Sequence, residues 1–321
     1  MTPTRLNLAL AAALAAAMAL SLLAGKVWLP ATAWSLTDPR FLIILELRAP
    51  RAVLGALVGA ALGLSGAAMQ GYLRNPLADP GLFGISAGAA LGAVISLFFG
   101  FASALLLPAF ALAGAAIAMA LLALLVGRSG SMLVFTLGGV ILSSIAGSMT
   151  ALAISLAPTP FATSQIVTWL MGALTDRSWD DVQIAAPPIL AGGLLLTCTA
   201  RSLDALTLGE TAARSMGVDP RRLQILVILG VGLCVGASVA AAGIIGFVGL
   251  MVPHLVRPLA GHRPSAILLP SALGGALLVV VADSLVRAAP TVSELRLGIA
   301  MSMLGGPFFL ALLLRMRRQL P

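Results

Sequence analysis

The stretch AVLGALVGAALGLSGAAMQG, residues 52–71, carries no charged side chain along its 20 residues. A run of this length and apolarity is enough for a helix to cross the hydrocarbon core of a bilayer. Gly55, Gly59 and Gly63 recur every four residues, so they share one helix face and allow a neighbouring helix to approach closely. The stretch therefore predicts a tightly packed membrane-spanning helix.

A rigid polar turn follows this helix, with the sequence Arg74-Asn75-Pro76-Leu77-Ala78-Asp79-Pro80. Its prolines restrict the backbone, and the side chains of Asn75 and Asp79 can accept hydrogen bonds from nearby amides. The four-residue glycine spacing then returns in the next apolar run, at positions 84, 88 and 92. A similar break, from Val252-Pro253-His254 to Gly261-His262-Arg263-Pro264, hints at two related halves.

The rest of the chain has the same character. Sixty per cent of its residues are hydrophobic and 9% are charged, against about a quarter charged in a soluble domain. Cutting at charges, prolines and turns gives ten apolar segments. They are residues 6–25, 52–71, 82–101, 103–126, 132–156, 182–199, 223–242, 243–256, 265–286 and 297–314. We expect an all-α polytopic membrane protein with about ten transmembrane helices, forming a single domain over residues 1–321.

Two of these segments need comment. Residues 6–25 are longer than the roughly 7–15 apolar residues of a secretory signal, so we interpret them as a membrane span. Residues 243–256 are too short to span as a straight helix and contain Pro253, which predicts a broken helix or one packed inside the bundle.

The placement of basic residues predicts the orientation. With the N-terminus inside, 12 of the 19 basic residues fall in inner loops, which favours both termini in the cytoplasm. These are Arg5, Arg74, Arg128, Arg201, Arg214, Arg221, Arg222, Arg257, Arg263, Arg315, Arg317 and Arg318. The other 7 fall outside: Lys26, Arg40, Arg48, Arg51, Arg177, Arg287 and Arg296. The net charge of +8 does not indicate nucleic-acid binding, because no basic helix face is interleaved with aromatic residues.

Two loops are more than plain connectors. In residues 158–181, the apolar side chains of 165–174 follow one helical side and predict an interfacial or re-entrant outer helix. Residues 201–222 form the largest cytoplasmic loop, and 208–217 within it reads as a short helix. Glu210 and Arg214 are spaced for an ion pair, Gly217 suits a C-terminal cap, and Asp219-Pro220 suits the start of the next span.

No catalytic or metal-binding pattern stands out. His254 and His262 lack Cys or carboxylate neighbours at metal-ligand spacing, and Cys198 and Cys234 lie in apolar runs. Asp283 is the only acid inside a span, and Arg287 one turn later predicts an ion pair at the outer membrane edge. A nucleotide-binding P-loop needs Gly-Lys-Ser/Thr, whereas Lys26 is followed by valine. If ATP drives transport, a separate subunit must hydrolyse it, and the 208–217 helix is the best candidate for its docking site.

Several motifs together resemble one family. They are 48–51 (RAPR), 65–70 (SGAAMQ), 74–80 (RNPLADP), 84–89 (GISAGA), Gly209-Glu210 with Ala213 and Gly217, 246–250 (GFVGL) with Pro253-His254 and Arg257, Ala282-Asp283, Glu294-Leu295, Gly298-Ile299 and 305–308 (GGPF). In this order they are similar to the FecCD-type permeases of iron–siderophore, haem and cobalamin import. Arg296 departs from the pattern, since the family often has proline there.

The resemblance implies a type II importer permease of the ATP-binding-cassette class, which is not itself an enzyme. It implies a homodimer with the pathway at the dimer interface, in the inner membrane of a bacterium. Two ATPase subunits, which would bind the ATP and Mg²⁺, would contact Leu208, Gly209, Glu210, Ala213, Arg214 and Gly217. A periplasmic binding protein would dock through acidic residues on Arg48, Arg51 and Arg287. No cofactor is expected in this chain.

Alternatives remain open at this point. An ATP-independent secondary transporter is disfavoured by the scarcity of titratable groups in the spans, and a membrane-embedded enzyme by the lack of clustered polar groups. The three arginines could instead anchor the span ends at lipid headgroups. Among cargoes, the resemblance favours a ferric siderophore, then haem, then cobalamin.

Overall fold

The computed structural model describes residues 3–35, 38–101, 103, 105–127, 132–290 and 294–317. The predicted inner arginines Arg128 and Arg318 lie outside the described residues. The α-helices are α1 (Pro3–Leu23), α2 (Ala49–Leu73), α3 (Ile85–Phe98), α4 (Leu106–Val126), α5 (Met132–Ser155), α6 (Pro160–Leu170), α7 (Trp179–Cys198), α8 (Ala200–Leu206), α9 (Glu210–Ser215), α10 (Pro220–Ala242), α11 (Val248–Ala260), α12 (Pro264–Ala288) and α13 (Leu297–Arg317). Short turns of 3-10 or π-helix cover Ala31–Trp34, Ile43–Arg48 and Pro80–Phe83.

Ten of these helices correspond to the ten predicted segments. Seven are long and apolar enough to span a membrane, and the shorter apolar helices α3, α11 and α13 complete the set. The prediction of an all-helical polytopic membrane protein is confirmed. The eighth segment is also as predicted, because its first residues, 243–247, are not helical and α11 is largely buried.

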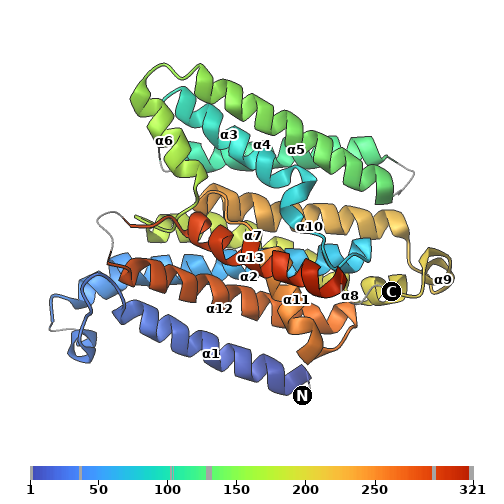
Figure 1. Ribbon diagram of the computed structural model, residues 1–321, viewed down its shortest axis with the longest axis horizontal. Helices are drawn as coiled ribbons and strands as arrows, with labels where there is room; N and C mark the ends of the chain where they lie inside the picture. Colours follow the sequence, from blue (N-terminus) through green and yellow to red (C-terminus); the bar gives the residue numbers. More distant parts are fainter. Residues whose placement is uncertain are drawn as a thin grey trace.

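The helix α2 lies in the middle of the bundle, in contact with α7, α10, α11 and α12 (Figure 1). Its glycines explain the position. A Cβ atom at Gly59 or Gly63 would overlap the backbone of α12, and one at Gly66 would overlap the carbonyl of Gly249 in α11. The predicted close approach along this glycine face is thus confirmed for α12, and Gly66 extends it to α11.

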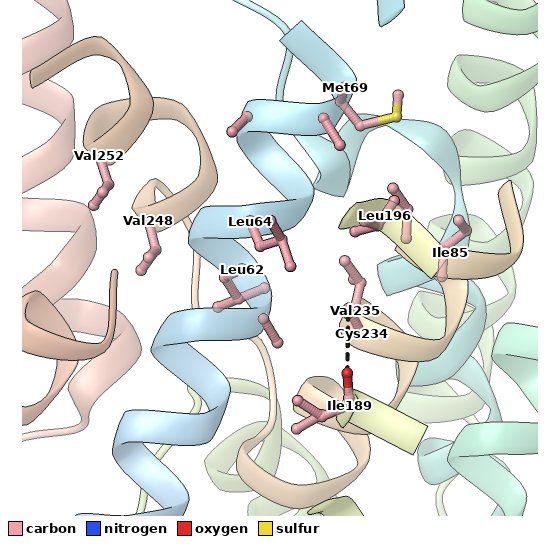
Figure 2. Close-up of a cluster of buried hydrophobic side chains, with 14 of the residues drawn as sticks. Leu62, Leu64, Met69, Ile85, Ile189, Leu196, Cys234, Val235, Val248 and Val252 are labelled. Carbon is pink, nitrogen blue, oxygen red and sulfur yellow. Dashed lines mark hydrogen bonds between the residues drawn. The ribbon is translucent and has the colours of Figure 1, made fainter. Parts of the chain in front are cut away.

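Apolar side chains fill the spaces around α2. Figure 2 shows Leu62 and Leu64 of α2 between Val248 and Val252 of α11 on one side and Val235 of α10 on the other. Cys234 is buried here, with its Sγ 3.6 Å from the carbonyl oxygen of Ile189. The core is therefore continuous across helices that are far apart in the sequence.

The turn between α2 and α3 has the predicted hydrogen bonds. The Leu77 amide donates to Asn75 Oδ1 at 2.9 Å, and the Gly81 amide donates to Asp79 Oδ1 at 2.6 Å. Arg74 ends α2 in the left-handed region, with φ of 49°. Burial raises the pKa of Asp79 above its usual value. The turn is a fixed, hydrogen-bonded corner at the end of α2.

Two sequence expectations need correction. The second break does not begin at Pro253, because α11 continues through Pro253 and Pro258 to Ala260, and the chain breaks only at Gly261–Arg263. The bundle around α11 supports the proline positions that would end an isolated helix. The outer helix is Pro160–Leu170, not 165–174, because Thr159 caps its start and Gly172 turns the chain with φ of 68°.

Figure 1 shows that α9, the start of α1 and the end of α13 lie at one end of the bundle. The segment between α1 and α2 lies at the opposite end, where α2 begins and α12 ends. The two predicted functional regions are thus separated by the full length of the spans.

Candidate functional site

The first candidate site is the short helix α9 and its caps. Gly209 precedes the helix with φ of 98°, and Gly217 follows it with φ of 84°. The Gly217 amide donates to the Arg214 carbonyl at 2.9 Å, and the Val218 amide donates to the Ala213 carbonyl at 3.0 Å. This pair of bonds is the Schellman motif, in which a left-handed residue closes the helix. The predicted cap at Gly217 is confirmed.

The bundle holds this loop firmly at its base. Asp204 in α8 accepts hydrogen bonds from the Ser265 amide at 2.9 Å and from the Ser265 hydroxyl at 2.6 Å, which ties α8 to the start of α12. Leu203 and Ala213 are almost fully buried. Asp219 caps α10 by accepting from the Arg221 amide at 2.9 Å, as predicted.

The tip of the loop, in contrast, is open. Leu208 and Met216, which flank α9, are 66% and 62% exposed. Large apolar side chains held outside on a rigid loop are typical of a protein contact surface. Glu210 and Arg214 are both exposed, and among the described residues no ion pair joins them. That predicted pair is wrong, since a solvated pair on a helix of six residues gains too little to hold two long side chains in place.

The second candidate site lies at the other end and is built on Asp283. Arg51 Nη2 lies 2.8 Å from Asp283 Oδ1, and Arg287 Nε lies 3.1 Å from Asp283 Oδ2. Arg51 also bonds to Glu294, just before α13. The predicted Asp283–Arg287 pair is confirmed, and it belongs to a network that joins α2, α12 and the segment before α13.

The arginines of this network also hold the end of α1. Arg287 Nη2 donates to the Ser21 hydroxyl at 2.6 Å and to its carbonyl at 3.1 Å. Arg48 donates to the carbonyls of Leu22 at 3.1 Å and Val27 at 2.8 Å. Arginine suits this task because its planar fork can serve several acceptors at once.

A cavity of about 480 Å³ opens beside the network. Its lining carries five basic and three acidic side chains: Lys26, Arg48, Arg51, Arg177, Arg287, Glu46, Asp176 and Glu294. The structure therefore brings together all three predicted docking arginines. It does not leave them free: Arg51 and Arg287 are 9% and 6% exposed, and Arg48 is half-buried. Each is already bonded inside the chain.

The charge network is the feature that sequence reasoning missed. The bond between Arg51 and Asp283 joins residues 232 positions apart, and local spacing carries no signal for such a contact. Elsewhere among the described residues, no three His, Cys, Asp or Glu side chains gather where they could hold a metal ion. A helical bundle of membrane spans with a charged network at one end and a rigid loop at the other fits the class of membrane transport subunits.

The comparisons with known proteins agree with this class. The FecCD transport family matches residues 13–315, and the chain belongs to that family. It is 40% identical to the uncharacterized ABC transporter permease YvrB of Bacillus subtilis, over 88% of this chain and 81% of that one. It is 37% identical to the hemin permease HmuU of Yersinia pestis, over 90% and 88% of the two chains. It is 38% identical to the vitamin B12 permease BtuC of Salmonella typhi, over 93% and 91%.

The fold agrees as well. A solved structure of an inward-facing conformation of a metal-chelate type ABC transporter superposes with a TM-score of 0.90 and 31% identity, covering 97% of this chain and 99% of that one. The chain is thus a membrane permease of the metal-chelate, haem and cobalamin type of ABC importers, with the type II permease fold.

Proposed function

We propose that this permease imports a chelated metal, first of all a ferric siderophore, from the periplasm across a bacterial inner membrane. The family places haem and cobalamin chelates in the same class, and the named relatives carry hemin and vitamin B12. The absence of a metal-ligand cluster among the described residues supports a cargo whose metal is already held by its chelator.

The partners follow from the two ends of the bundle. We propose that two copies of the chain form a homodimer, and that one ATPase subunit docks on each copy at Leu208, Gly209, Glu210, Ala213, Arg214 and Gly217. The observation that carries this proposal is the rigid loop that exposes Leu208 and Met216 at one end of the bundle. Since the start of α1 and the end of α13 lie at this same end, both termini would be cytoplasmic (Figure 1).

A periplasmic binding protein would dock at the opposite end. The excess of basic over acidic side chains around the outer cavity supports an acidic partner there. Arg51 and Arg287 would act mainly by holding the surface in shape, because their forks already serve internal acceptors. Arg48, which is only half-buried, is the docking arginine most open to direct contact.

The test is uptake by proteoliposomes that contain the permease, its ATPase and its binding protein. We expect uptake of a ferric siderophore with ATP inside, and little uptake of the free ferric ion. Haem and cobalamin serve as the competing cargoes. A preference for haem or cobalamin would change the assigned chelate but keep the importer class. A preference for the bare ion would contradict a chelate importer.

A further inference from the structure

A second cavity, of about 300 Å³, lies at the outer end between α6, the end of α10 and the start of α13. It is lined by polar side chains of α6, including Gln165, Thr168 and Trp169, and by Asp176, Arg177 and Arg296. None of the predicted docking arginines lines it. Two basic side chains and one carboxylate, Asp176, are the charged groups among the described lining residues.

Two buried N–H groups of this lining lack a hydrogen-bond partner in the described part of the chain. They are Nε1 of Trp169 and Nε of Arg177. Arg177 makes one contact, from Nη1 to Asp181 at 3.4 Å, and this leaves its Nε unused. Buried donors are almost always paired, because leaving one unpaired costs the free energy of removing it from water. Both N–H atoms are closed off from solvent and so do not themselves face the cavity, but the Arg177 side chain is 22% exposed and has only this long contact inside the described part of the chain.

Arg296 adds a further cation. It is half-buried, and within the described ranges its guanidinium contacts no acceptor. Its guanidinium adds a second charged fork to the lining of this cavity.

The backbone under the cavity is fixed. The Ala173 amide donates to the Ala242 carbonyl at 2.8 Å, and the Gly298 amide donates to the Gly172 carbonyl at 3.1 Å. These bonds join the segment after α6 to the end of α10 and the start of α13. A Cβ at Gly172 would overlap the carbonyl of Ile244, so the three segments are packed in direct contact. The backbone that carries these side chains is therefore fixed before any ligand arrives, which favours binding.

We propose that this cavity binds a carboxylate of the cargo, through Arg296 and Arg177. Planar guanidinium groups match the geometry of a carboxylate, and the lining carries two basic side chains but one acidic side chain. The volume is at the lower end of small-molecule sites, so the cavity takes an acidic arm of a chelate and not the whole molecule. The inference rests on the proposed import of chelates and names the kind of chelate that is selected.

The experiment measures binding to the permease alone, in lipid nanodiscs and without ATP, by isothermal titration. The first probe is ferric citrate, which is soluble and carries free carboxylates. The second is ferrioxamine B, an iron chelate of similar size class that has no carboxylate. We expect saturable, salt-sensitive binding of ferric citrate and at least about tenfold weaker binding of ferrioxamine B, as for the loss of a charge-assisted hydrogen bond.

Three variants place this binding in the cavity. Arg296→Gln should weaken ferric citrate binding by about tenfold. Arg177→Gln should weaken it to a similar degree, because the second guanidinium of the lining is lost. Arg40→Gln is the matched control, since Arg40 is an arginine predicted for the outer side that bonds to Asp38 and does not line this cavity. It should change nothing.

Equal binding of the two probes, no binding of ferric citrate, or binding unchanged in Arg296→Gln and Arg177→Gln would overturn the proposal. A failure of the importer function would be detected separately, as a lack of ATP-dependent uptake. If chelates are taken up but ferric citrate does not bind, the importer function stands and the proposed carboxylate site is wrong.

Discussion

Arg51 of α2 bonds to Asp283 of α12 at 2.8 Å, and both side chains are almost fully buried at the end of the bundle opposite α9. Asp283 also pairs with Arg287, so two guanidinium groups share this carboxylate, and Glu294 supplies a second negative charge beside Arg51. The arginines that the family resemblance assigns to docking are thus held by the permease itself. Any docking surface at this end depends on the network beneath it.

Replacing this carboxylate should destabilise the permease strongly. In Asp283→Asn, two buried arginines lose their shared counter-ion, which costs about 3–5 kcal/mol when one partner of a buried pair is removed. The measurement is the thermal unfolding of the detergent-solubilised protein. Asp38→Asn is the control, because Asp38 pairs with Arg40 in an exposed loop where the interaction is screened. Similar melting temperatures for the two variants would show that the network does not support the fold.

Helix contacts through glycine give a second prediction. Gly66→Ala should lower the melting temperature, because the new Cβ would overlap the Gly249 carbonyl and force α2 and α11 apart. Gly147→Ala in α5 is the matched control, since nothing lies within 4 Å of that position. There alanine should be neutral or slightly stabilising. An unchanged melting temperature in Gly66→Ala would contradict the packing of these two helices.

The coupling loop can be tested with two glycines of similar backbone conformation. Gly217→Val should reduce cargo-stimulated ATP hydrolysis severalfold, because φ of 84° is strained for a β-branched residue and α9 would lose its cap. Gly100→Val introduces comparable strain, because Gly100 has φ of 75° and also lies in open space. Gly100 follows the C-terminal end of α3 and is not part of the α9 loop. It should insert and stimulate hydrolysis normally. Equal loss in both variants would point to a general folding defect, and no loss in either would exclude α9 as the coupling element.

Docking at the outer end should depend on Arg48 and on salt. Arg48→Glu should weaken binding of the periplasmic protein by about tenfold or more, because attraction to acidic residues becomes repulsion. Affinity for the parent should also fall as salt is raised. The corresponding changes at Arg51 and Arg287 are less informative, since they place a new carboxylate beside Asp283 and would disturb the fold. If neither salt nor Arg48→Glu changes the affinity, these arginines serve the membrane surface and not a protein partner.

The fold could be read from the sequence because membrane spans leave a local signal. Length, apolarity and glycine spacing in residues 52–71 were enough to predict a closely packed span, and the cap at Gly217 follows from one residue type at one position. Contacts such as Arg51–Asp283 leave no such signal, since they depend on which helices become neighbours. The continuous helix through Pro253 was missed for the same reason: neighbouring helices stabilise it, and they cannot be seen in the local sequence.

This permease should move its cargo only when a separate ATPase hydrolyses ATP. The most direct measurement is uptake of a radiolabelled ferric siderophore into proteoliposomes that hold the permease, the binding protein and either the active ATPase or a variant that binds but does not hydrolyse ATP. We expect the labelled siderophore to accumulate with the active ATPase and not to rise above background with the inactive one. Accumulation at the same rate with both, or without any ATPase, would contradict it and favour a secondary transporter.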